Sequence, residues 1–278
     1  MRTSHTDEQP AGGPGGGPFD FSIVTPSLNQ GAYLADCLAS VREAAARSGR
    51  RVEHFVADGG SSDRTPDILR NQTFARWISG PDGGQTDAIN LGIARTSGDI
   101  VSYLCADDLL EPDALARVWG AFAANPDAGV VYGDAYFLEG TWKRPKTAGE
   151  FSVARLRAGN FLFQPAVFLR RAVLDAHGPF DVTLRYCMDH EYWLRVAESA
   201  RWVSAGVPLA CCRLHADAKT WTSLPAAWDE ARRMQLRYGI RWRPLRDAIW
   251  MRLLGCHYYR LKRLVFARLA RLRGRGET

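Results

Sequence analysis

Short apolar runs alternate with amphipathic stretches over the first half of the chain. Runs rich in β-branched and aromatic residues occupy 21–27, 52–58, 75–80, 99–108 and 129–138, and this composition is typical of buried strands. The stretches between them, 32–49, 66–72, 86–98 and 112–126, repeat apolar residues at helical spacing. The alternation predicts an α/β fold, with a Rossmann-like, mostly parallel sheet and helices on both faces.

The pattern changes beyond about residue 150. We expect a strand near 166–170, a helix over 189–199 and two strand-like pieces within 201–215. Residues 1–18 are dense in Gly and Pro, which predicts a disordered leader. The sequence therefore divides into a leader (1–18), a main domain (19–220) and a C-terminal tail (221–278).

The tail is basic and amphipathic. Residues 231–278 hold fourteen Lys and Arg against two acids, a net charge of +12, whereas the whole chain carries +6, so the remainder sums to −6. Apolar side chains recur at helical steps from Trp250 to Leu272, which predicts basic amphipathic helices lying on an anionic membrane surface. The alternative is a helix packed on the main domain or on a second subunit. We expect no nucleic-acid partner.

Several protein classes are disfavoured by composition. No run of eighteen apolar residues occurs, and the N-terminus lacks the apolar segment of a secretory signal. The six cysteines show neither a Cys-x-x-Cys pair nor zinc spacing, which favours a reducing compartment without disulfides. We therefore expect a cytoplasmic protein that is peripheral at the inner membrane face.

Polar clusters follow each of the first four predicted strands: "TPSLNQ", "DGGSSD", "PDGGQTD" and "ADD". In parallel sheets, ligands bind beyond the carboxyl ends of the strands, so all four clusters point to one crevice. Two adjacent carboxylates, Asp107 and Asp108, repel each other unless a cation such as Mg²⁺ or Mn²⁺ compensates them. The alternative is a cluster of acids that favours the N-terminus of the next helix.

Together, "TPSLNQGAYLADCLASV", "DGGSSDRT", "PDGGQTDAINLGIARTSGDIVSYLCADDLL" and "MDHEYWLR" resemble the family 2 glycosyltransferases of GT-A fold. The resemblance covers about residues 20–215, in order and spacing. It implies a nucleotide-sugar donor, a divalent metal and inversion at the anomeric carbon. It also divides the main domain into a nucleotide-sugar half (19–138) and an acceptor half (139–220).

The resemblance assigns roles to single residues. It implies that Thr25 and Pro26 line the nucleotide pocket, that Asp58 bonds the base, usually uracil, and that Asp87, with Gln85 nearby, lies near the ribose and phosphates. Asp107 and Asp108 stand at the family's D-x-D motif, whose first Asp is replaced by Cys105 or Ala106 according to alignment. We assign the metal to Asp108 and the ribose to Asp107. His215 matches a late metal-ligating His, or else serves as a structural hydrogen-bonding residue.

An inverting transfer needs a base to accept the proton of the acceptor hydroxyl. The family uses the Asp of a Glu-Asp pair, matched here by Met188 and Asp189, so Asp189 is the expected base and Glu191 the substitute. Asp189 also suits a helix N-cap. Gln164 is a candidate contact to an acceptor hydroxyl.

We therefore expect a Mg²⁺- or Mn²⁺-dependent enzyme that moves a sugar, from a donor that is UDP-linked by default, to a glycan or lipid-linked acceptor in cell-surface polysaccharide synthesis. The alternatives are a nucleotidyltransferase that makes a nucleotide-sugar, or a non-catalytic protein that binds a membrane or nucleic acid. The first rival lacks a basic residue directly after the first strand.

Overall fold

The computed structural model describes residues 3–5, 19–215 and 224–240 of the chain. The chain divides into two compact units. The first comprises the residues up to Thr183 together with Met188–Arg213, and the second comprises Leu184–Cys187 and the residues from Leu214 onwards. The first unit therefore ends at Arg213, a little before the predicted division at residue 220.

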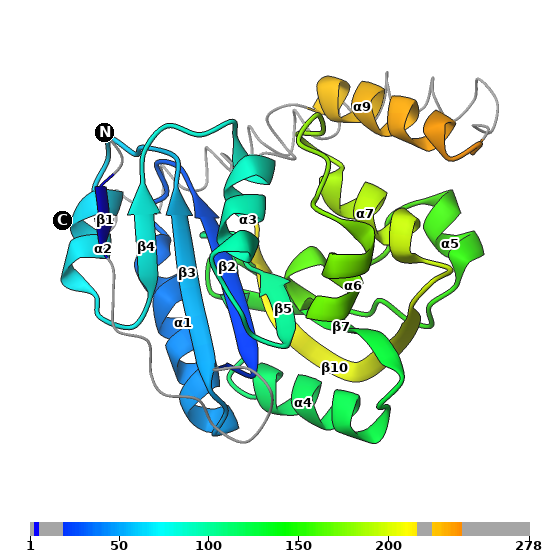
Figure 1. The fold of residues 1–278 in the computed structure, drawn as a ribbon, viewed down its shortest axis with the longest axis horizontal. Coiled ribbons are helices and arrows are strands. Elements are labelled where there is room, and N and C mark those ends of the chain that lie inside the picture. Colours follow the sequence, from blue (N-terminus) through cyan, green and yellow to red (C-terminus); the bar gives the residue numbers. More distant parts are fainter. Residues whose placement is uncertain (1–2, 6–18, 216–223, 241–278) are drawn as a thin grey trace. The chain divides into compact units, whose positions relative to one another are not determined.

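A single mixed sheet organises the first unit (Figure 1). Its order is β1-β4-β3-β2-β5-β9-β7-β10-β6, and β8 pairs with β7. The strands are β1 (Thr3–His5), β2 (Phe21–Ser27), β3 (Val52–Asp58), β4 (Arg76–Ser79), β5 (Ile100–Tyr103), β6 (Leu109–Leu110), β7 (Ala128–Glu139), β8 (Trp142–Lys146), β9 (Val167–Arg170) and β10 (Arg201–Arg213). Strands β4, β3, β2 and β5 are parallel, which confirms the predicted parallel core.

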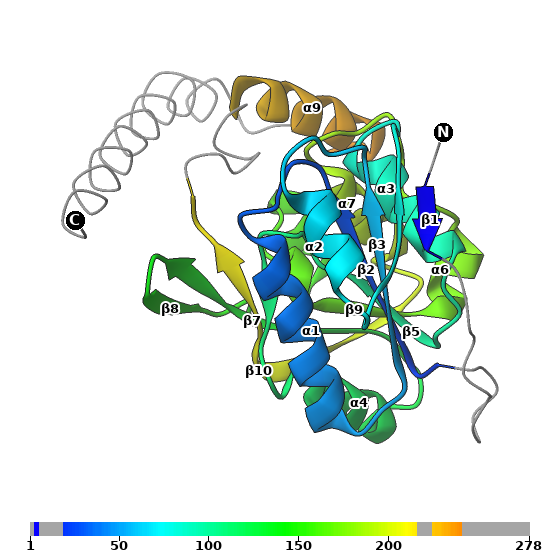
Figure 2. The ribbon, with the colours of Figure 1, turned by 90° about the vertical axis from the view of Figure 1, so that its left-hand side faces the viewer.

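Helices cover both faces of this sheet (Figure 2). In the first unit they are α1 (Leu34–Ser48), α2 (Thr65–Asn71), α3 (Gln85–Ala94), α4 (Ala114–Ala124), α5 (Val153–Ala158), the 3₁₀ helix η1 (Gln164–Ala166), α6 (Arg171–His177) and α7 (Met188–Val196). In Figure 2, α1 and α2 lie on one side of the strands and α3 and α6 on the other. The two-sided cover is the one that the sequence predicts.

The alternation of side chains along β2 explains this arrangement. Phe21 and Ile23 pack with Cys37 and Val41 of α1 in one hydrophobic core cluster, while Val24 points to the opposite face. There it meets α3 at Gly92, where a Cβ would lie 2.3 Å from a Val24 methyl carbon. The strand is buried on both faces, as is typical of parallel sheets.

Some elements differ from the prediction. Residues 201–213 form one irregular strand, β10, with shifts of register, instead of two pieces. Strand β8 was not predicted because all five of its residues are exposed and no apolar alternation marks it. Thr3–His5, within the expected leader, form β1 and pair with β4; the other leader residues lie outside the described ones.

The second unit contains α9 (Leu224–Arg237). The buried carboxylate of Glu230 in α9 accepts hydrogen bonds from the backbone N–H groups of Arg185, Tyr186 and Cys187, at 2.8, 2.6 and 3.0 Å. In the described part of the chain, no helix has the length and apolarity to cross a bilayer. The apolar stripe predicted from Trp250 to Leu272 lies outside the described residues, so the basic amphipathic tail stays a prediction.

Candidate active site

The loops that follow β2 and β3 are tied to each other. The N–H of Asn29 donates to Oγ of Ser61 at 2.7 Å, and Oδ1 of Asn29 accepts from the N–H of Ser62 at 2.9 Å. The N–H of Gly31 donates to Asp63 at 2.8 Å. Asn29 adopts the left-handed conformation (φ 53°), which asparagine tolerates well. The clusters "TPSLNQ" and "DGGSSD" therefore form one rim of the sheet's carboxyl edge.

Asp58 ends β3 and is almost completely buried (3% exposed). Its carboxylate accepts hydrogen bonds from Oγ and N–H of Ser61, at 2.5 and 3.1 Å, and from Oγ of Ser79 on β4, at 2.5 Å. A carboxylate offers about four acceptor positions, so three internal donors leave capacity for one more. This position is compatible with the predicted bond to a base.

Thr25 and Pro26 lie within β2, and both are buried. Oγ1 of Thr25 is 2.8 Å from Nε2 of His54, and burial lowers the pKa of His54 to about 3, so that this imidazole is neutral. The Thr25 hydroxyl is therefore engaged within the core. The contact of these two residues with a nucleotide stays a prediction.

Gln85 and Asp87 lie in the first turn of α3. Oδ2 of Asp87 accepts from the N–H of Gly83 at 3.0 Å, and the amide of Gln85 donates to Sγ of Cys105 at 3.2 Å. The N-terminus of a helix attracts anions. Gln85 thus connects the predicted phosphate-binding turn to the segment that carries the acidic pair.

Cys105, Asp107 and Asp108 form a cluster directly after β5. One Sγ atom and two carboxylate oxygens lie within 4.8 Å of one another, and the three residues are partly exposed. Burial, and then the negative charge of Asp107, raise the pKa of Asp108 well above its ordinary value. The acids are separated from α4 by β6, and Asp113 occupies the N-cap of that helix. The alternative of a helix N-terminal cluster is therefore disfavoured.

Asp189 lies in the first turn of α7, and its Oδ2 accepts from the amide of Asn160 at 2.9 Å. Burial raises the pKa of Asp189. Burial, followed by the negative charges of Asp189, Cys105 and Asp108, raises the pKa of Tyr103 at the end of β5. The approach of Asp189 to the acidic cluster stays a prediction.

Three further candidate residues are Glu191, Gln164 and His215. The carboxylate of Glu191 is engaged by Arg195, with N–O distances of 2.7 and 3.2 Å, so Asp189 stays the predicted base. Gln164 donates to the carbonyl of Tyr103 at 2.5 Å and so lies at the end of β5. His215 belongs to the second unit, and its metal-ligand role stays a prediction.

The sequence did not reveal Arg213, the last residue of β10. Its backbone N–H donates to Oδ1 of Asp108 at 3.0 Å, and its Nε donates to the carbonyl of Asp107 at 3.0 Å. A second guanidinium nitrogen lies 3.2 Å from Asp36. The only signal in the sequence was a basic residue at the end of a strand-like run, and its pairing could not be foreseen.

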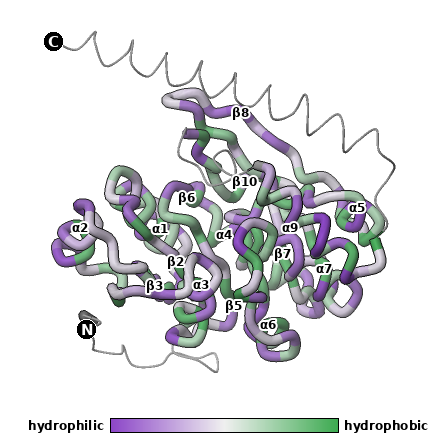
Figure 3. The backbone as a smooth tube through the Cα atoms, turned by 90° about the horizontal axis from the view of Figure 1, so that it is seen from above, coloured by the Kyte–Doolittle hydropathy of each residue, from purple (hydrophilic) through white to green (hydrophobic). Residues whose placement is uncertain are grey.

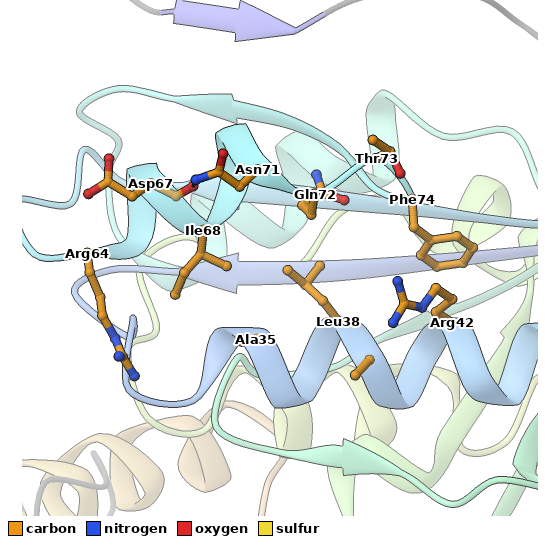
Figure 4. A pocket seen from close by; sticks show the side chains of 11 residues that line it. Ala35, Leu38, Arg42, Arg64, Asp67, Ile68, Asn71, Gln72, Thr73 and Phe74 are labelled. Atoms are coloured by element: carbon orange, nitrogen blue, oxygen red, sulfur yellow. Dashed lines mark hydrogen bonds between the residues drawn. The ribbon is translucent and has the colours of Figure 1, made fainter.

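A groove of about 420 Å³ lies elsewhere in the first unit, between α1 and α2 (Figure 4). Leu38 and Ile68 form its floor, while Arg42, Arg64 and Asp67 lie along its sides. None of the predicted site residues lines it. This groove is therefore separate from the carboxyl-edge site.

The cluster after β5 fits a divalent cation by the chemistry of its donors. Carboxylate oxygens are the ligands that Mg²⁺ and Mn²⁺ prefer, and Asp107 and Asp108 supply them on adjacent residues. The thiol of Cys105 is a softer donor. The residues present therefore fit the metal that the resemblance implies.

Comparisons with known proteins identify the family of the chain. The family described as "Glycosyl transferase family 2" matches residues 22–185. A "PGL/p-HBAD biosynthesis glycosyltransferase" of Mycobacterium bovis is 32% identical over 183 residues, covering 63% of this chain and 68% of that protein. An uncharacterized glycosyltransferase of Mycobacterium tuberculosis is 33% identical over 180 residues, with the same coverage.

Solved structures share the fold at low sequence identity. Staphylococcus aureus TarS in complex with UDP aligns with a TM-score of 0.62 and 18% identity, covering 78% of this chain and 64% of the TarS chain. A mannosyltransferase from Pyrobaculum calidifontis, in complex with GDP-Man and Mn²⁺, aligns with a TM-score of 0.59 and 17% identity, covering 94% and 76%. The chain is a GT-A glycosyltransferase and belongs to glycosyl transferase family 2.

Proposed function

We propose that the protein transfers a sugar, with inversion, from a nucleoside-diphosphate sugar, with UDP as the expected nucleotide, to a glycan or lipid-linked acceptor. The observation that supports this proposal is the cluster that Asp107 and Asp108 form with Cys105 directly after β5, and we place Asp189 opposite it as the base. A donor held by the acidic pair would present its anomeric carbon to an acceptor activated by Asp189.

Donor binding would use the carboxyl ends of β3 and β5. These strands flank β2, so their carboxyl ends are two strand spacings apart, roughly 10 Å. One nucleoside diphosphate can reach across that separation. We assign the base to Asp58, the ribose and diphosphate to the start of α3 with Gln85 and Asp87, and the metal to Asp108 with Asp107 beside it.

A bound Mg²⁺ or Mn²⁺ would supply positive charge to the departing diphosphate. Asp189 would accept the proton of the acceptor hydroxyl as the oxygen attacks the anomeric carbon. The bond from that carbon to the diphosphate oxygen breaks, and its electron pair leaves with the nucleotide. The raised pKa of Asp189 suits this task, because it makes the carboxylate a stronger base than an exposed one.

The family assignment favours sugar transfer over the synthesis of nucleotide-sugars. We place the enzyme in cell-surface polysaccharide synthesis, at the cytoplasmic membrane face. The support for this location is the basic, amphipathic sequence from 231 to 278. Removal of residues 240–278 should release the protein from anionic vesicles, and unchanged binding would reject a membrane role for the tail.

The decisive experiment screens nucleotide-sugars by thermal shift with Mg²⁺ or Mn²⁺ and then measures donor hydrolysis. Wild-type protein should bind and slowly hydrolyse at least one nucleoside-diphosphate sugar. The variant Asp108→Ala should lose metal-dependent binding, whereas Asp189→Asn should keep binding and lose turnover. If no nucleotide-sugar binds the wild-type protein, the proposal fails.

A further inference from the structure

The hairpin formed by β7 and β8 exposes an unusual side chain. Trp142, the first residue of β8, is 72% exposed, and all five residues of the strand are exposed. A two-residue turn with Gly140 at a φ of 59° joins the two strands. Tryptophan normally contributes a large buried area. An indole left in water at the end of a hairpin therefore calls for a functional explanation.

The strand pairing in the hairpin determines which side chains lie on each of its two faces. Alternate residues of a strand share one face, so Trp142, Arg144 and Lys146 lie together. Their cross-strand partners include Glu139, opposite Trp142, and Phe137, opposite Arg144. Lys146 lies 5.6 Å from the centre of the Phe137 ring, and Arg144 lies 3.5 Å from the Glu139 carboxylate. One face thus combines an exposed indole, two cations and one acid.

The opposite face contacts the protein through the side chain of Lys143. Lys143 points there, and its Nζ lies 2.8 Å from Glu111 and 5.2 Å from the centre of the Tyr136 ring. Its charge is therefore already neutralised by a protein carboxylate. The two faces of the same five-residue strand differ in what they offer to a partner.

The hairpin extends from the sheet edge that carries the site. Strands β5 and β7 are both antiparallel to β9, so they run in the same direction and their carboxyl ends share an edge. Glu111, which holds Lys143, follows Asp108 by three residues. Figures 2 and 3 show β8 reaching beyond the helices that cover the sheet.

We propose that the face bearing Trp142, Arg144 and Lys146 docks on an anionic phospholipid bilayer. Tryptophan is enriched at the headgroup boundary of membranes, where its apolar ring and polar N–H are both satisfied. Arginine and lysine beside it are attracted by lipid phosphates. A single indole with two cations is too small for a stable protein interface, which buries about 1,200 Å² or more in total.

This docking rests on the membrane location proposed above and adds a second contact to it, but it does not depend on donor chemistry. It turns the carboxyl edge of the sheet towards the bilayer. A lipid-linked acceptor would meet the active site there without leaving the membrane. The hairpin would act in addition to any contact made by the C-terminal tail.

The test uses the full chain and vesicles of phosphatidylcholine with or without phosphatidylglycerol, in the absence of any nucleotide-sugar. Lys146→Ala should lower the partition coefficient on anionic vesicles about fivefold, the effect of one basic residue at the surface. Trp142→Ala should lower it about tenfold, as expected for partial burial of a large side chain. Lys143→Ala, which removes the same charge from the opposite face, is the matched control and should change it less than about twofold.

A second measurement uses brominated lipids, which quench tryptophan fluorescence only on close approach. The wild-type protein should be quenched more strongly than Trp142→Phe, in which eight of the nine tryptophans of the chain remain, including Trp250 of the tail that we also expect at the membrane. Equal losses for Lys143→Ala and Lys146→Ala would overturn the proposal, as would unchanged binding of Trp142→Ala. If Trp142→Ala instead raised only the KM for a water-soluble acceptor, the indole would be a sugar platform and the membrane proposal would be wrong.

Discussion

The backbone N–H of Arg213 donates a hydrogen bond to Oδ1 of Asp108 over 3.0 Å. This bond joins the end of β10 to the acidic pair that follows β5, although the two residues are 105 positions apart. Because the donor is a backbone group, the bond survives substitution of the arginine side chain. The last long strand of the sheet therefore fixes the orientation of the proposed metal ligand.

Asp108 should destabilise the metal-free protein at neutral pH. Burial and Asp107 raise its pKa in the folded state, so the folded state holds the proton more tightly than the unfolded chain, whose pKa is about 3.9. This contribution to stability is fully present below the unfolded pKa and is lost as the pH rises through the raised folded pKa. In EDTA at about pH 7, Asp108→Asn should therefore unfold at a higher temperature than the wild type.

The difference between Asp108→Asn and wild type should shrink towards about pH 4. Excess Mn²⁺ should reverse the order, because a ligand at about a hundred times its Kd stabilises the folded state by about 2.7 kcal/mol and only the wild type keeps both carboxylates. Calorimetry at several pH values checks both points. A variant that is less stable than the wild type in EDTA would contradict this account.

Asp189→Asn should abolish turnover while sparing donor affinity. Loss of a general base lowers kcat by about 10²- to 10⁴-fold, and the amide keeps the size of the carboxylate. Glu191→Gln is the control, because that carboxylate is engaged by Arg195, and its kcat should stay closer to wild type. Stopped assays for kcat and calorimetric titration with nucleotide-sugar separate the two effects.

The pH dependence of turnover reports on the same residue. Only the ionised Asp189 can accept a proton, so activity should fall as the pH drops through its raised pKa. The pH at which kcat falls on the acidic side of its pH profile should therefore lie above the pKa range of an exposed aspartate. Asn160→Ala removes a hydrogen bond that favours the ionised form and should move that fall to still higher pH; a shift to lower pH would contradict the assignment.

Asp58 should contribute to the binding of the nucleotide base and not to the binding of the diphosphate. Its remaining acceptor capacity suits a ring N–H, so Asp58→Asn should weaken UDP binding about tenfold, the value of one hydrogen bond to a charged group. Pyrophosphate binding should change little. Ser79→Ala, which removes one internal donor to Asp58, is the companion variant and should keep UDP affinity within a few-fold. Equal losses for UDP and pyrophosphate would argue against a base contact.

Cys105 should shift the metal preference of the site. Its Sγ lies within 4.8 Å of the ligand oxygens of Asp107 and Asp108, and thiolate favours softer ions than Mg²⁺. Cys105→Asp should raise the affinity for Mn²⁺ and Mg²⁺ by roughly tenfold and lower that for Cd²⁺. Competition titrations check this, with Cys105→Ser as the isosteric control. Unchanged Cd²⁺ affinity would place the thiol outside the coordination shell.

Two helical glycines should respond in opposite ways to alanine. A Cβ on Gly92 in α3 would lie 2.3 Å from a Val24 methyl carbon, so Gly92→Ala should destabilise the fold by about 1–3 kcal/mol. A Cβ on Gly120 in α4 would meet open space, so Gly120→Ala should stabilise the fold by about 0.5–1 kcal/mol. Denaturant unfolding of both variants tests the packing of α3 on β2.

The spacing of apolar residues along the chain, together with the residues that end helices, determined the strands of the parallel core. The five strands predicted in the first half of the chain correspond to β2, β3, β4, β5 and β7, and Gly49 ends α1 in the left-handed conformation typical of a C-cap. These features are local, since alternation and helical spacing are read over a few residues. The position of the polar clusters at strand ends followed from the same reasoning, and it placed Asp58, Asp107 and Asp108 on one edge.

Tertiary structure decided which side chains meet. Thr25 lies in a strand that was correctly predicted. Its hydroxyl reaches His54 inside the core only because β2 pairs with β3. The neighbouring strand therefore sets the environment of the side chain. The bond between Arg213 and Asp108, and the exposed face of β8, likewise depend on strand order and register. Those are long-range pairings, and no local pattern specifies them, since the partners are distant in sequence and come together only when the sheet forms.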